Sequence, residues 1–305
     1  MAVEKEITFI VGCPRSGTTF LATLLREFFD IGFVNELQII PIFYKKLKNY
    51  IPLTEKKNLD RLVSDIIKDN FFDIFRKTYS KYVGKPINIT KEDILSLLPE
   101  KSYAGVIYSI LENAAIKIGK TRVGSKNPDS YLDIINELFP RAKVIHIIRD
   151  GRDCALSFYR MHWGHTNAYM AAKTWKLHVS KNRYLGSSLL MDRYIELKYE
   201  DLLSNPISQL NRLANFLHLS VDWKNVEKLV ESMTIKNNFY KWKKKMTQKD
   251  LKIFQAVAGD LLQECGYELA PVDPIQLTKF HEIYYNLMDK FLREFRYRFH
   301  KYLPT

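Results

Sequence analysis

The segment from Ile7 to Leu25, ITFIVGCPRSGTTFLATLL, constrains the fold of this chain more than any other part of it. An apolar run leads into a turn with two glycines, Gly12 and Gly17, and then into a segment with helical apolar spacing that begins near Thr18. Glycines five positions apart allow the tight backbone of a phosphate-binding loop, in which amide N–H groups converge on an anion. The positive end of the helix dipole adds to that attraction. The segment therefore predicts a strand, an anion-binding turn and a helix; a glycine turn that merely joins strand to helix is the alternative.

The residues that follow the second glycine argue against an NTPase. ATP- and GTP-hydrolysing P-loops carry a Lys at that point, which neutralises the β- and γ-phosphates. This chain has Thr18 and Thr19 there, and its cation stands upstream at Arg15. Two hydroxyls and an Arg around a nest of amides suit a smaller anion, such as one phosphate that carries a transferred group. A P-loop kinase of a small metabolite remains a competing hypothesis.

A second segment, KVIHIIRDGRDCALSFY from Lys143 to Tyr159, has the features of a second ligand contact. Val144 to Ile148 form an apolar run typical of a buried strand, and Arg149 follows it directly. Open parallel sheets place their ligand contacts at the carboxyl ends of the strands. Asp150 can cap the helix that follows, so we interpret Asp150 and Asp153 as structural residues rather than a catalytic pair.

The order of apolar runs and helical periods predicts an α/β fold, namely a P-loop-type three-layer fold with a central parallel sheet flanked by helices. The ligand crevice is expected at the carboxyl ends of the strands. We predict one domain over residues 1–305. Five strands are expected, at Ile7–Val11, near Phe33–Val34, and at Arg122–Ser125, Val144–Ile148 and Ile195–Leu197.

Two parts of the chain are expected to add to this core. Residues from about 43 to 120 carry helical patterning with many aromatic side chains, and we interpret this insert as a wall beside the acceptor, with ordinary helix packing as the alternative. From about 274 to 303 the apolar residues fall on one stripe of an amphipathic helix. Docking of this helix on the domain, a homodimer face and contact with an anionic membrane surface stay open as alternatives.

Charge and cysteine content limit the partners and the compartment. Lys and Arg outnumber Asp and Glu by 13, which suits a ligand with several phosphate and sulfate charges, nucleic acid or a membrane face. We find no zinc spacing, helix-turn-helix or RNA-recognition motif, so no nucleic-acid partner is expected. Cys13, Cys154 and Cys265 are odd in number and widely spaced, which indicates a reducing compartment. Because no apolar stretch has the length of a signal peptide core or a membrane span, a cytoplasmic protein without a transmembrane segment is expected.

The two phosphate-binding segments resemble those of sulfotransferases that use 3′-phosphoadenosine 5′-phosphosulfate (PAPS). PRSGTT after a buried strand is similar to the 5′-phosphosulfate loop of that family. The second segment is similar to its 3′-phosphate site, in which an Arg that closes a strand and a Ser eight residues later hold the ribose 3′-phosphate. The resemblance gives these roles to Arg149 and Ser157. It implies PAPS as cofactor, adenosine 3′,5′-bisphosphate as product and no metal.

Three further matches resemble the tyrosylprotein-type and related bacterial branch of the family. VNELQIIP from Val34 places Glu36 where that branch has a glutamate as catalytic base. Gly124 to Pro128, GSKNP, is similar to a strand end whose lysine, here Lys126, faces the transferred group. LKYEDL from Leu197 is similar to a late element whose tyrosine, here Tyr199, approaches the cofactor. Gln38 stands where tyrosylprotein sulfotransferases have an Arg, which argues against a peptidyl-tyrosine acceptor.

From this resemblance we expect transfer of a sulfuryl group to a hydroxyl, less favourably an amine, of a small-molecule, lipid or carbohydrate acceptor. Glu36 would accept the proton of the acceptor, and Lys126 and Arg15 would stabilise the charge that develops on the sulfonate and bridging oxygens. The expected cofactor-binding residues are Arg15, Ser16, Gly17, Thr18, Thr19, Arg149, Ser157, Tyr199 and Lys241.

Several of these residues have simpler interpretations. Glu36 could cap a helix or pair with a surface Lys, and Lys126 could be a solvated cation. Tyr199 could be a core ring, and the run from Lys241 to Lys245 could be a solvated charge cluster. His162 or His165 could line the acceptor pocket, whereas His146 lies in a core strand. A noncatalytic protein that keeps the nucleotide pocket is the second competing hypothesis.

Overall fold

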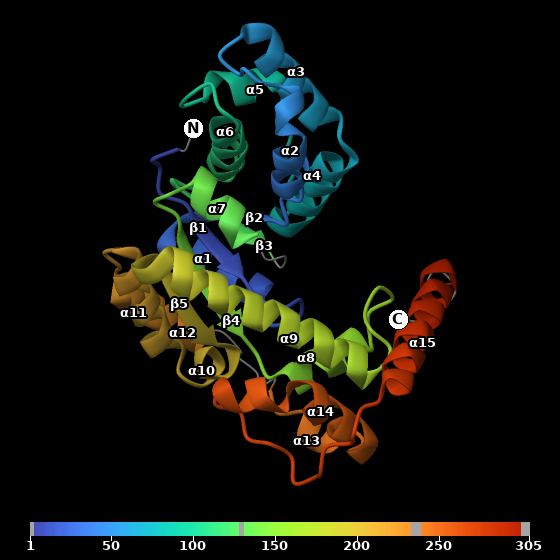
Figure 1. Cartoon of the computed structure of the whole chain (residues 1–305). Helices are drawn as coiled ribbons and strands as arrows, with labels where there is room; N and C mark the ends of the chain where they lie inside the picture. Colours follow the sequence, from blue (N-terminus) through green and yellow to red (C-terminus); the bar gives the residue numbers. More distant parts are fainter. Residues whose placement is uncertain (1–2, 128–130, 233–238, 300–305) are drawn as a thin grey trace.

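The computed structural model describes residues 3–127, 131–232 and 239–299 (Figure 1). Five strands form one parallel sheet in the order β2-β3-β1-β4-β5. They are β1 (Thr8–Val11), β2 (Ile31–Asn35), β3 (Arg122–Asn127), β4 (Lys143–Ile148) and β5 (Tyr194–Lys198). The predicted strands and the α/β fold class, a central parallel sheet flanked by helices, are confirmed.

Fifteen helices are assigned over the described residues. They are α1 (Thr18–Phe29), α2 (Ile39–Lys46), α3 (Lys56–Lys68), α4 (Asn70–Val83), α5 (Lys91–Ser96), α6 (Tyr103–Ile116), α7 (Leu132–Leu138), α8 (Gly151–Phe158), α9 (Ala168–Leu185), α10 (Tyr199–Ser204), α11 (Pro206–Leu217), α12 (Trp223–Ser232), α13 (Trp242–Lys245), α14 (Gln248–Glu264) and α15 (Lys279–Phe299). Short 3₁₀ turns lie at Leu47–Asn49 and Met191–Arg193, and a π-helical turn lies at Gly186–Leu190.

The alternation of side chains along the strands builds the two faces of the sheet. Successive residues of a strand point to opposite faces, so Phe9 and Val11 share one face while Ile10 lies on the other. Phe9 and Val11 belong to a core with α6 and α7. Ile10 packs in a separate core with Leu21 and Leu25 of α1 and with residues of α11 and α12. The sheet is therefore covered by helices on both faces, which leaves the ends of the strands for a ligand site.

The part of the chain from 43 to 120, expected as a helical insert, holds most of α2 to α6 (Figure 1). These helices connect β2 to β3 and form one end of the molecule. Phe72, Phe75 and Tyr79 of α4 are buried, and the rings of Phe75 and Tyr79 stack with centroids 5.9 Å apart. Ordinary helix packing therefore accounts for these three aromatic residues.

The last described helix, α15, docks through a narrow polar face. Asp289 is buried, and its carboxylate accepts hydrogen bonds from the backbone and side chain of Thr166 and contacts His165 Nδ1 at 2.9 Å. The ring of Tyr285 stacks on Tyr169 of α9, and Arg296 donates to the carbonyl of Tyr159. Although burial raises the pKa of Asp289, the hydrogen bonds from His165 and Thr166 outweigh it and hold that pKa below its usual range.

The apolar stripe of α15 does not form this contact. Leu287 and Phe291, at the centre of the stripe, are 62% and 67% exposed. Docking of this helix on the domain, one of the three alternatives from the sequence, is therefore confirmed, but it involves the polar face and leaves the apolar stripe exposed. None of the helices within the described ranges combines the length and the apolar composition needed to cross a membrane.

Candidate functional site

The predicted site residues gather at one edge of the sheet, where all five parallel strands end. The glycine turn follows β1, and Glu36 follows β2 by one residue. Lys126 is the penultimate residue of β3, while Arg149 and Tyr199 come directly after β4 and β5. Because the carboxyl ends of parallel strands meet at the same edge, a chain of short contacts joins these segments.

The turn after β1 has the backbone of an anion cradle. The Ser16 N–H donates to the Cys13 carbonyl at 3.0 Å, which closes the turn. Gly17 has a φ of 96°, and a Cβ there would lie 2.4 Å from the ring of Tyr199. A Cβ on Gly12 would lie 2.5 Å from the Ile147 carbonyl oxygen. Both glycines are thus required by close approach of neighbouring atoms, and Gly17 also by its left-handed backbone.

The donors of this turn fit a phosphate. Helix α1 starts at Thr18 with no side-chain cap, so the amides of its first turn are left to a ligand or to water. Ser16 Oγ is buried, and it is one of the buried polar atoms of the described chain that have no hydrogen-bond partner. A phosphate seated on the helix terminus would supply the missing acceptor, so the residues present suit such a group.

The two anion-binding segments contact each other directly. Arg15 Nε donates to Ser157 Oγ of α8 at 2.8 Å, and Arg149 Nη1 donates to the Arg15 carbonyl at 3.2 Å. Arg15 itself has a φ of 74°, a conformation that costs a non-glycine residue on the order of 1–3 kcal/mol. The tertiary structure thus holds Arg15 in a strained backbone between the predicted 5′- and 3′-phosphate contacts.

A second cluster joins Lys126, Glu36 and Thr19. Lys126 Nζ donates to Thr19 Oγ1 at 3.0 Å and lies 3.4 Å from Glu36 Oε1. The Glu36 N–H donates to the Lys126 carbonyl at 2.8 Å, although the φ of Glu36 is 45°. The Glu36 side chain is 51% exposed and that of Lys126 only 7%. Burial lowers the pKa of Lys126, the neighbouring Arg15 lowers it further, and Glu36 opposes both without restoring the usual value.

Tyr199 covers the junction between the two anion-binding segments. Its ring lies against Gly17, and the Arg149 guanidinium sits 4.6 Å from the centroid of the same ring. The ring of Phe20 of α1 meets the Tyr199 ring edge to face, with 6.4 Å between the two ring centroids. Tyr199 is 7% exposed, so the ring acts as a buried wall that positions Arg149 and limits the space at Gly17.

A buried polar network beneath Arg149 was not expected from the sequence. Asp150 caps α8 as predicted, by accepting from the Arg152 N–H, and it also forms a salt bridge of 2.8 Å with the fully buried Arg152 side chain. Glu200 accepts from the Asp150 N–H and from the Tyr267 hydroxyl. These bonds fix the residues next to Arg149 and tie the end of β4 to that of β5. The signal available in the sequence was a pair of opposite charges within four residues of the end of one strand, Asp150 and Arg152, together with Glu200 just after the next strand.

The basic run from Lys241 to Lys245 is anchored beside the second anion-binding segment. The Trp242 N–H donates to Asp153 Oδ1 at 2.9 Å, and the Arg152 guanidinium lies 3.5 Å from the Trp242 ring centroid. Asp153 in turn lies 3.6 Å from Arg149 Nη2. Lys243 pairs with Glu268, and Lys241 is half-buried at the start of α13. Lys241 thus lies one residue from a contact to Asp153, but no contact joins its side chain to Arg15 or Arg149 within the described residues.

His146 and His165 form hydrogen bonds within the fold. His146 is fully buried in β4, where its Nδ1 is hydrogen-bonded to the Tyr194 hydroxyl at 2.6 Å, and burial lowers its pKa to about 3. His165 uses one ring nitrogen on Asp289 and the other on Thr174 Oγ1. Both ring nitrogens of His165 are thus engaged within the fold. That His162 or His165 lines the acceptor pocket stays a prediction. Pro128 and Asp129, which follow the lysine strand, lie outside the described residues.

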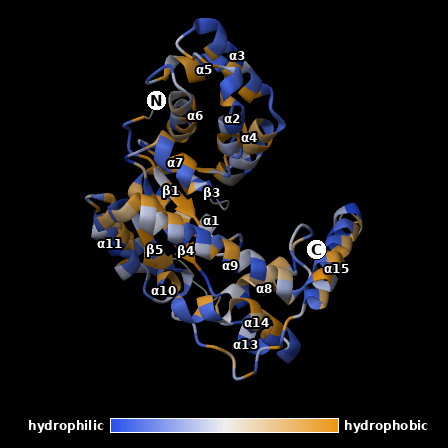
Figure 2. Cartoon of the chain, viewed as in Figure 1, coloured by the Kyte–Doolittle hydropathy of each residue, from blue (hydrophilic) through white to orange (hydrophobic). Residues whose placement is uncertain are grey.

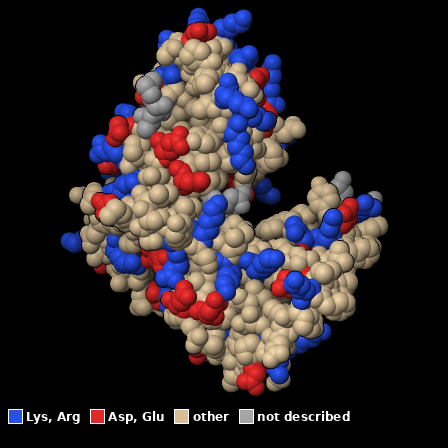
Figure 3. All heavy atoms as spheres, in the orientation of Figure 1, with Lys and Arg blue, Asp and Glu red and all other residues tan. Residues whose placement is uncertain are grey.

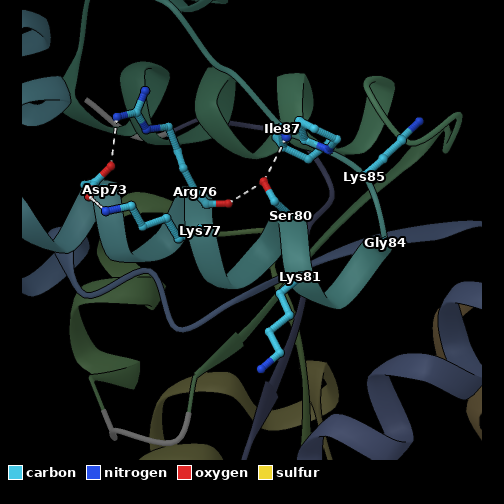
Figure 4. A pocket seen from close by; sticks show the side chains of 9 residues that line it. Asp73, Arg76, Lys77, Ser80, Lys81, Gly84, Lys85 and Ile87 are labelled. Atoms are coloured by element: carbon cyan, nitrogen blue, oxygen red, sulfur yellow. Dashed lines mark hydrogen bonds and ion pairs between the residues drawn. The ribbon is translucent and has the colours of Figure 1, made fainter.

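A basic pocket of about 560 Å³ lies elsewhere, along α4 (Figure 4). Its polar groups are largely engaged within the fold: Arg76 and Lys77 both pair with Asp73, and Ser80 accepts from the Ile87 N–H. Lys81 and Lys85 are exposed at its edge. None of the residues that line this pocket belongs to the clusters around Arg15 and Lys126.

Residues 8–224 match the protein-family model described as "Sulfotransferase family". A curated relative, an uncharacterized protein of Aquifex aeolicus (strain VF5), is 25% identical over 225 residues, which cover 71% of this chain and 26% of that protein. The chain thus spans about a quarter of the length of this relative.

Two solved structures share the fold. The sulfotransferase domain from the curacin biosynthetic pathway has a TM-score of 0.54 at 20% identity, covering 88% of this chain and 100% of that domain. The sulfotransferase domain from the Synechococcus PCC 7002 olefin synthase has a TM-score of 0.51 at 20% identity, covering 88% of this chain and 98% of that domain.

Proposed function

The chain belongs to the sulfotransferase family, and we propose that it transfers a sulfuryl group from PAPS to a hydroxyl of a small-molecule, lipid or carbohydrate acceptor, or less favourably to an amine. When bound, PAPS supplies the sulfuryl group and leaves as adenosine 3′,5′-bisphosphate. The contact that carries the proposal is the pair of hydrogen bonds that joins the turn after β1 to the start of α8, through Arg15, Ser157 and Arg149. A ligand with phosphates at two ends suits two anion-binding segments held together in this way.

In this proposal the amides from Ser16 to Thr19 hold the 5′-phosphate, and Arg149 and Ser157 hold the 3′-phosphate. Glu36 accepts the proton from the acceptor, whose oxygen or nitrogen bonds to sulfur while the sulfur–oxygen bond to the 5′-phosphate breaks. Lys126 and Arg15 stabilise the charge on the sulfonate and bridging oxygens. The burial of Lys126 supports its role, since a cation acts most strongly where water is excluded.

The finer assignments rest on particular residues. Glu36 and Tyr199 support a place beside the tyrosylprotein-type and related bacterial branch, and Gln38 speaks against a peptidyl-tyrosine acceptor. We assign Lys241 to the edge of the nucleotide site because Trp242 ties its segment to Asp153. Helices α2 to α6 would form the acceptor side, because α2 starts three residues after Glu36. The three cysteines are buried free thiols, which supports a reducing compartment such as the cytoplasm.

Titration calorimetry tests the nucleotide site with adenosine 3′,5′-bisphosphate, adenosine 5′-monophosphate and ATP with Mg²⁺. We expect the bisphosphate to bind much more tightly than the other two, because only it engages both anion-binding segments. Equal affinity for the three, or tighter binding of ATP, would refute the two-phosphate site and favour the kinase hypothesis.

Replacement of Arg149 by Ala should weaken binding of the bisphosphate about 10- to 100-fold, which is the loss expected for hydrogen bonds to a charged group. Binding of adenosine 5′-monophosphate should change much less, because it has no 3′-phosphate. The matched control is Arg141→Ala, since Arg141 is exposed and paired with Glu6 at the opposite end of the sheet. A parallel loss for both nucleotides would show that Arg149 acts on the fold rather than on the 3′-phosphate.

The pH dependence of turnover should report on Lys126. Burial is the main cause that lowers the pKa of this ammonium, and the proposed stabilisation of the sulfonate requires its charged form. Activity should therefore fall as the pH rises through that lowered pKa, below the range of an ordinary lysine. Initial rates at saturating PAPS across pH 7 to 10 measure this decline. In Lys126→Arg the decline should disappear, because a guanidinium stays charged over this range. If the variant shows the same pH profile, the decline arises from the titration of another group.

A further inference from the structure

Helix α15 presents an apolar face to solvent. Nine of the nineteen large hydrophobic side chains that are exposed over the described residues belong to it: Phe280, Ile283, Tyr284, Leu287, Met288, Phe291, Phe295, Tyr297 and Phe299. All of them except Tyr297 have another member of the set three or four residues away along the helix, so these eight lie on one face and form a continuous stripe. We call these eight residues the exposed stripe. Figure 2 shows hydrophobic residues along this helix.

The exposed stripe is held in place rather than carried on a loose tail. Asp289, Tyr285 and Arg296 dock the other side of the helix through the contacts to Thr166, Tyr169 and Tyr159. Figure 1 shows α15 at the margin of the molecule, beyond α8 and α9. An apolar surface that the fold holds outward is typical of an interaction site.

Cationic side chains accompany this stripe. Lys279 and Lys290 of α15 are exposed, and Arg298 is exposed but pairs with Glu294 at 2.8 Å. Figure 3 shows Lys and Arg side chains, with some Asp and Glu among them, on the arm of the molecule that ends in α15. A pocket of about 640 Å³ adjoins the start of the helix, and its lining includes Phe280 and Tyr284 together with Lys249 and Lys252 of α14. The surface thus offers apolar contact and positive charge side by side.

From this pairing we propose that α15 binds the surface of an anionic lipid bilayer, with the exposed stripe at the level of the acyl chains and the lysines at the phosphate headgroups. Charge complementarity selects this partner over a second copy, because each copy carries a net charge of +13 and its own cations beside the stripe. An amphipathic helix with aromatic and aliphatic residues on one face and cations at its flanks binds in the plane of such a surface. The family model ends at residue 224, before α15, and the proposal does not depend on sulfuryl transfer.

Sedimentation with sucrose-loaded vesicles tests this proposal on the full chain. Vesicles of phosphatidylcholine with about one third phosphatidylserine should retain the protein, and pure phosphatidylcholine should not. The double variant Leu287→Ser, Phe291→Ser should lower the retained fraction more than tenfold, since it removes two large apolar side chains from the contact with the acyl chains. The double variant Lys249→Glu, Lys252→Glu should also lower it, and so should about 0.5 M salt.

The control is Leu177→Ser on α9, a leucine that is 64% exposed but lies outside the exposed stripe, and its binding should equal that of the unaltered protein. Melting temperatures establish that the variants fold, and light scattering gives their oligomeric state. The proposal is overturned if anionic vesicles do not retain the unaltered protein, if neutral vesicles retain it equally, or if the stripe variant binds as well. It is also overturned if the protein is a dimer that the stripe variant converts to a monomer without any vesicle binding.

Discussion

Glu36→Gln should lower kcat about 10²- to 10⁴-fold, which is the range typical for loss of a general base. The affinity for adenosine 3′,5′-bisphosphate should stay within about twofold of the original. The amide keeps the size of the side chain and removes its capacity to take a proton. Glu36 is half exposed, and among the described residues its side chain contacts Lys126, so the change should leave the fold and the phosphate contacts intact. Single-turnover rates with labelled PAPS, beside calorimetry, measure the two quantities separately.

The matched control for this variant is Glu6→Gln. Glu6 is an exposed glutamate just before β1, at the end of the sheet away from the site, where it pairs with Arg141 at 3.6 Å. It should retain full activity. If Glu36→Gln turns over normally, Glu36 is not the base. If the unaltered protein binds the nucleotide but shows no turnover, the hypothesis of a noncatalytic nucleotide-binding protein is favoured.

The strands and the anion-binding segments were predictable because each is encoded locally. Ile10 and Val144 to Ile148 sit in apolar runs short enough for buried strands, and Gly12 and Gly17 mark the turn by their spacing. The parallel order then brings Glu36, Lys126 and Arg149 to one edge without further information. The proximity of these three residues therefore follows from the parallel order of the strands rather than from any single motif.

Other features depend on contacts between segments far apart in the chain, which no local pattern reveals. The amphipathic pattern of α15 predicted a helix but not the face through which it docks, because docking depends on the contacts of Asp289 with His165 and Thr166. The run at Lys241 looked like a solvated cluster, yet Trp242 ties it to Asp153. The burial of Arg152 likewise needs both Asp150 beside it and the Trp242 ring above it.

The strained backbones of Arg15 and Glu36 could not be predicted from the sequence either, since neither residue type favours a positive φ. Strain of this kind persists only where surrounding contacts hold it, as the Ser157 bond does for Arg15 and the Lys126 carbonyl does for Glu36. Both residues are candidates for catalysis on independent grounds. We therefore interpret the strain as the cost of holding Arg15 against Ser157 and Glu36 against Lys126.

Lys126→Ala should lower kcat about 10²- to 10³-fold, the loss expected when one preorganised stabiliser of transition-state charge is removed. The affinity for adenosine 3′,5′-bisphosphate should change little, because this product lacks the sulfuryl group that Lys126 faces in the proposal. Lys126 lies between Thr19 and Glu36, so its removal also frees Glu36 from its ion pair. Pre-steady-state rates with saturating PAPS measure the loss at the chemical step.

Two comparisons separate charge stabilisation from a structural role of this lysine. Lys120→Ala removes a lysine that precedes the same strand and pairs with Asp30 at 3.5 Å, and it should retain full activity. Combining Lys126→Ala with Glu36→Gln should cost less than the product of the two single losses, because residues that act on one transition state as a unit are not additive. Fully multiplicative losses would indicate that the 3.4 Å contact between the two side chains has no part in turnover.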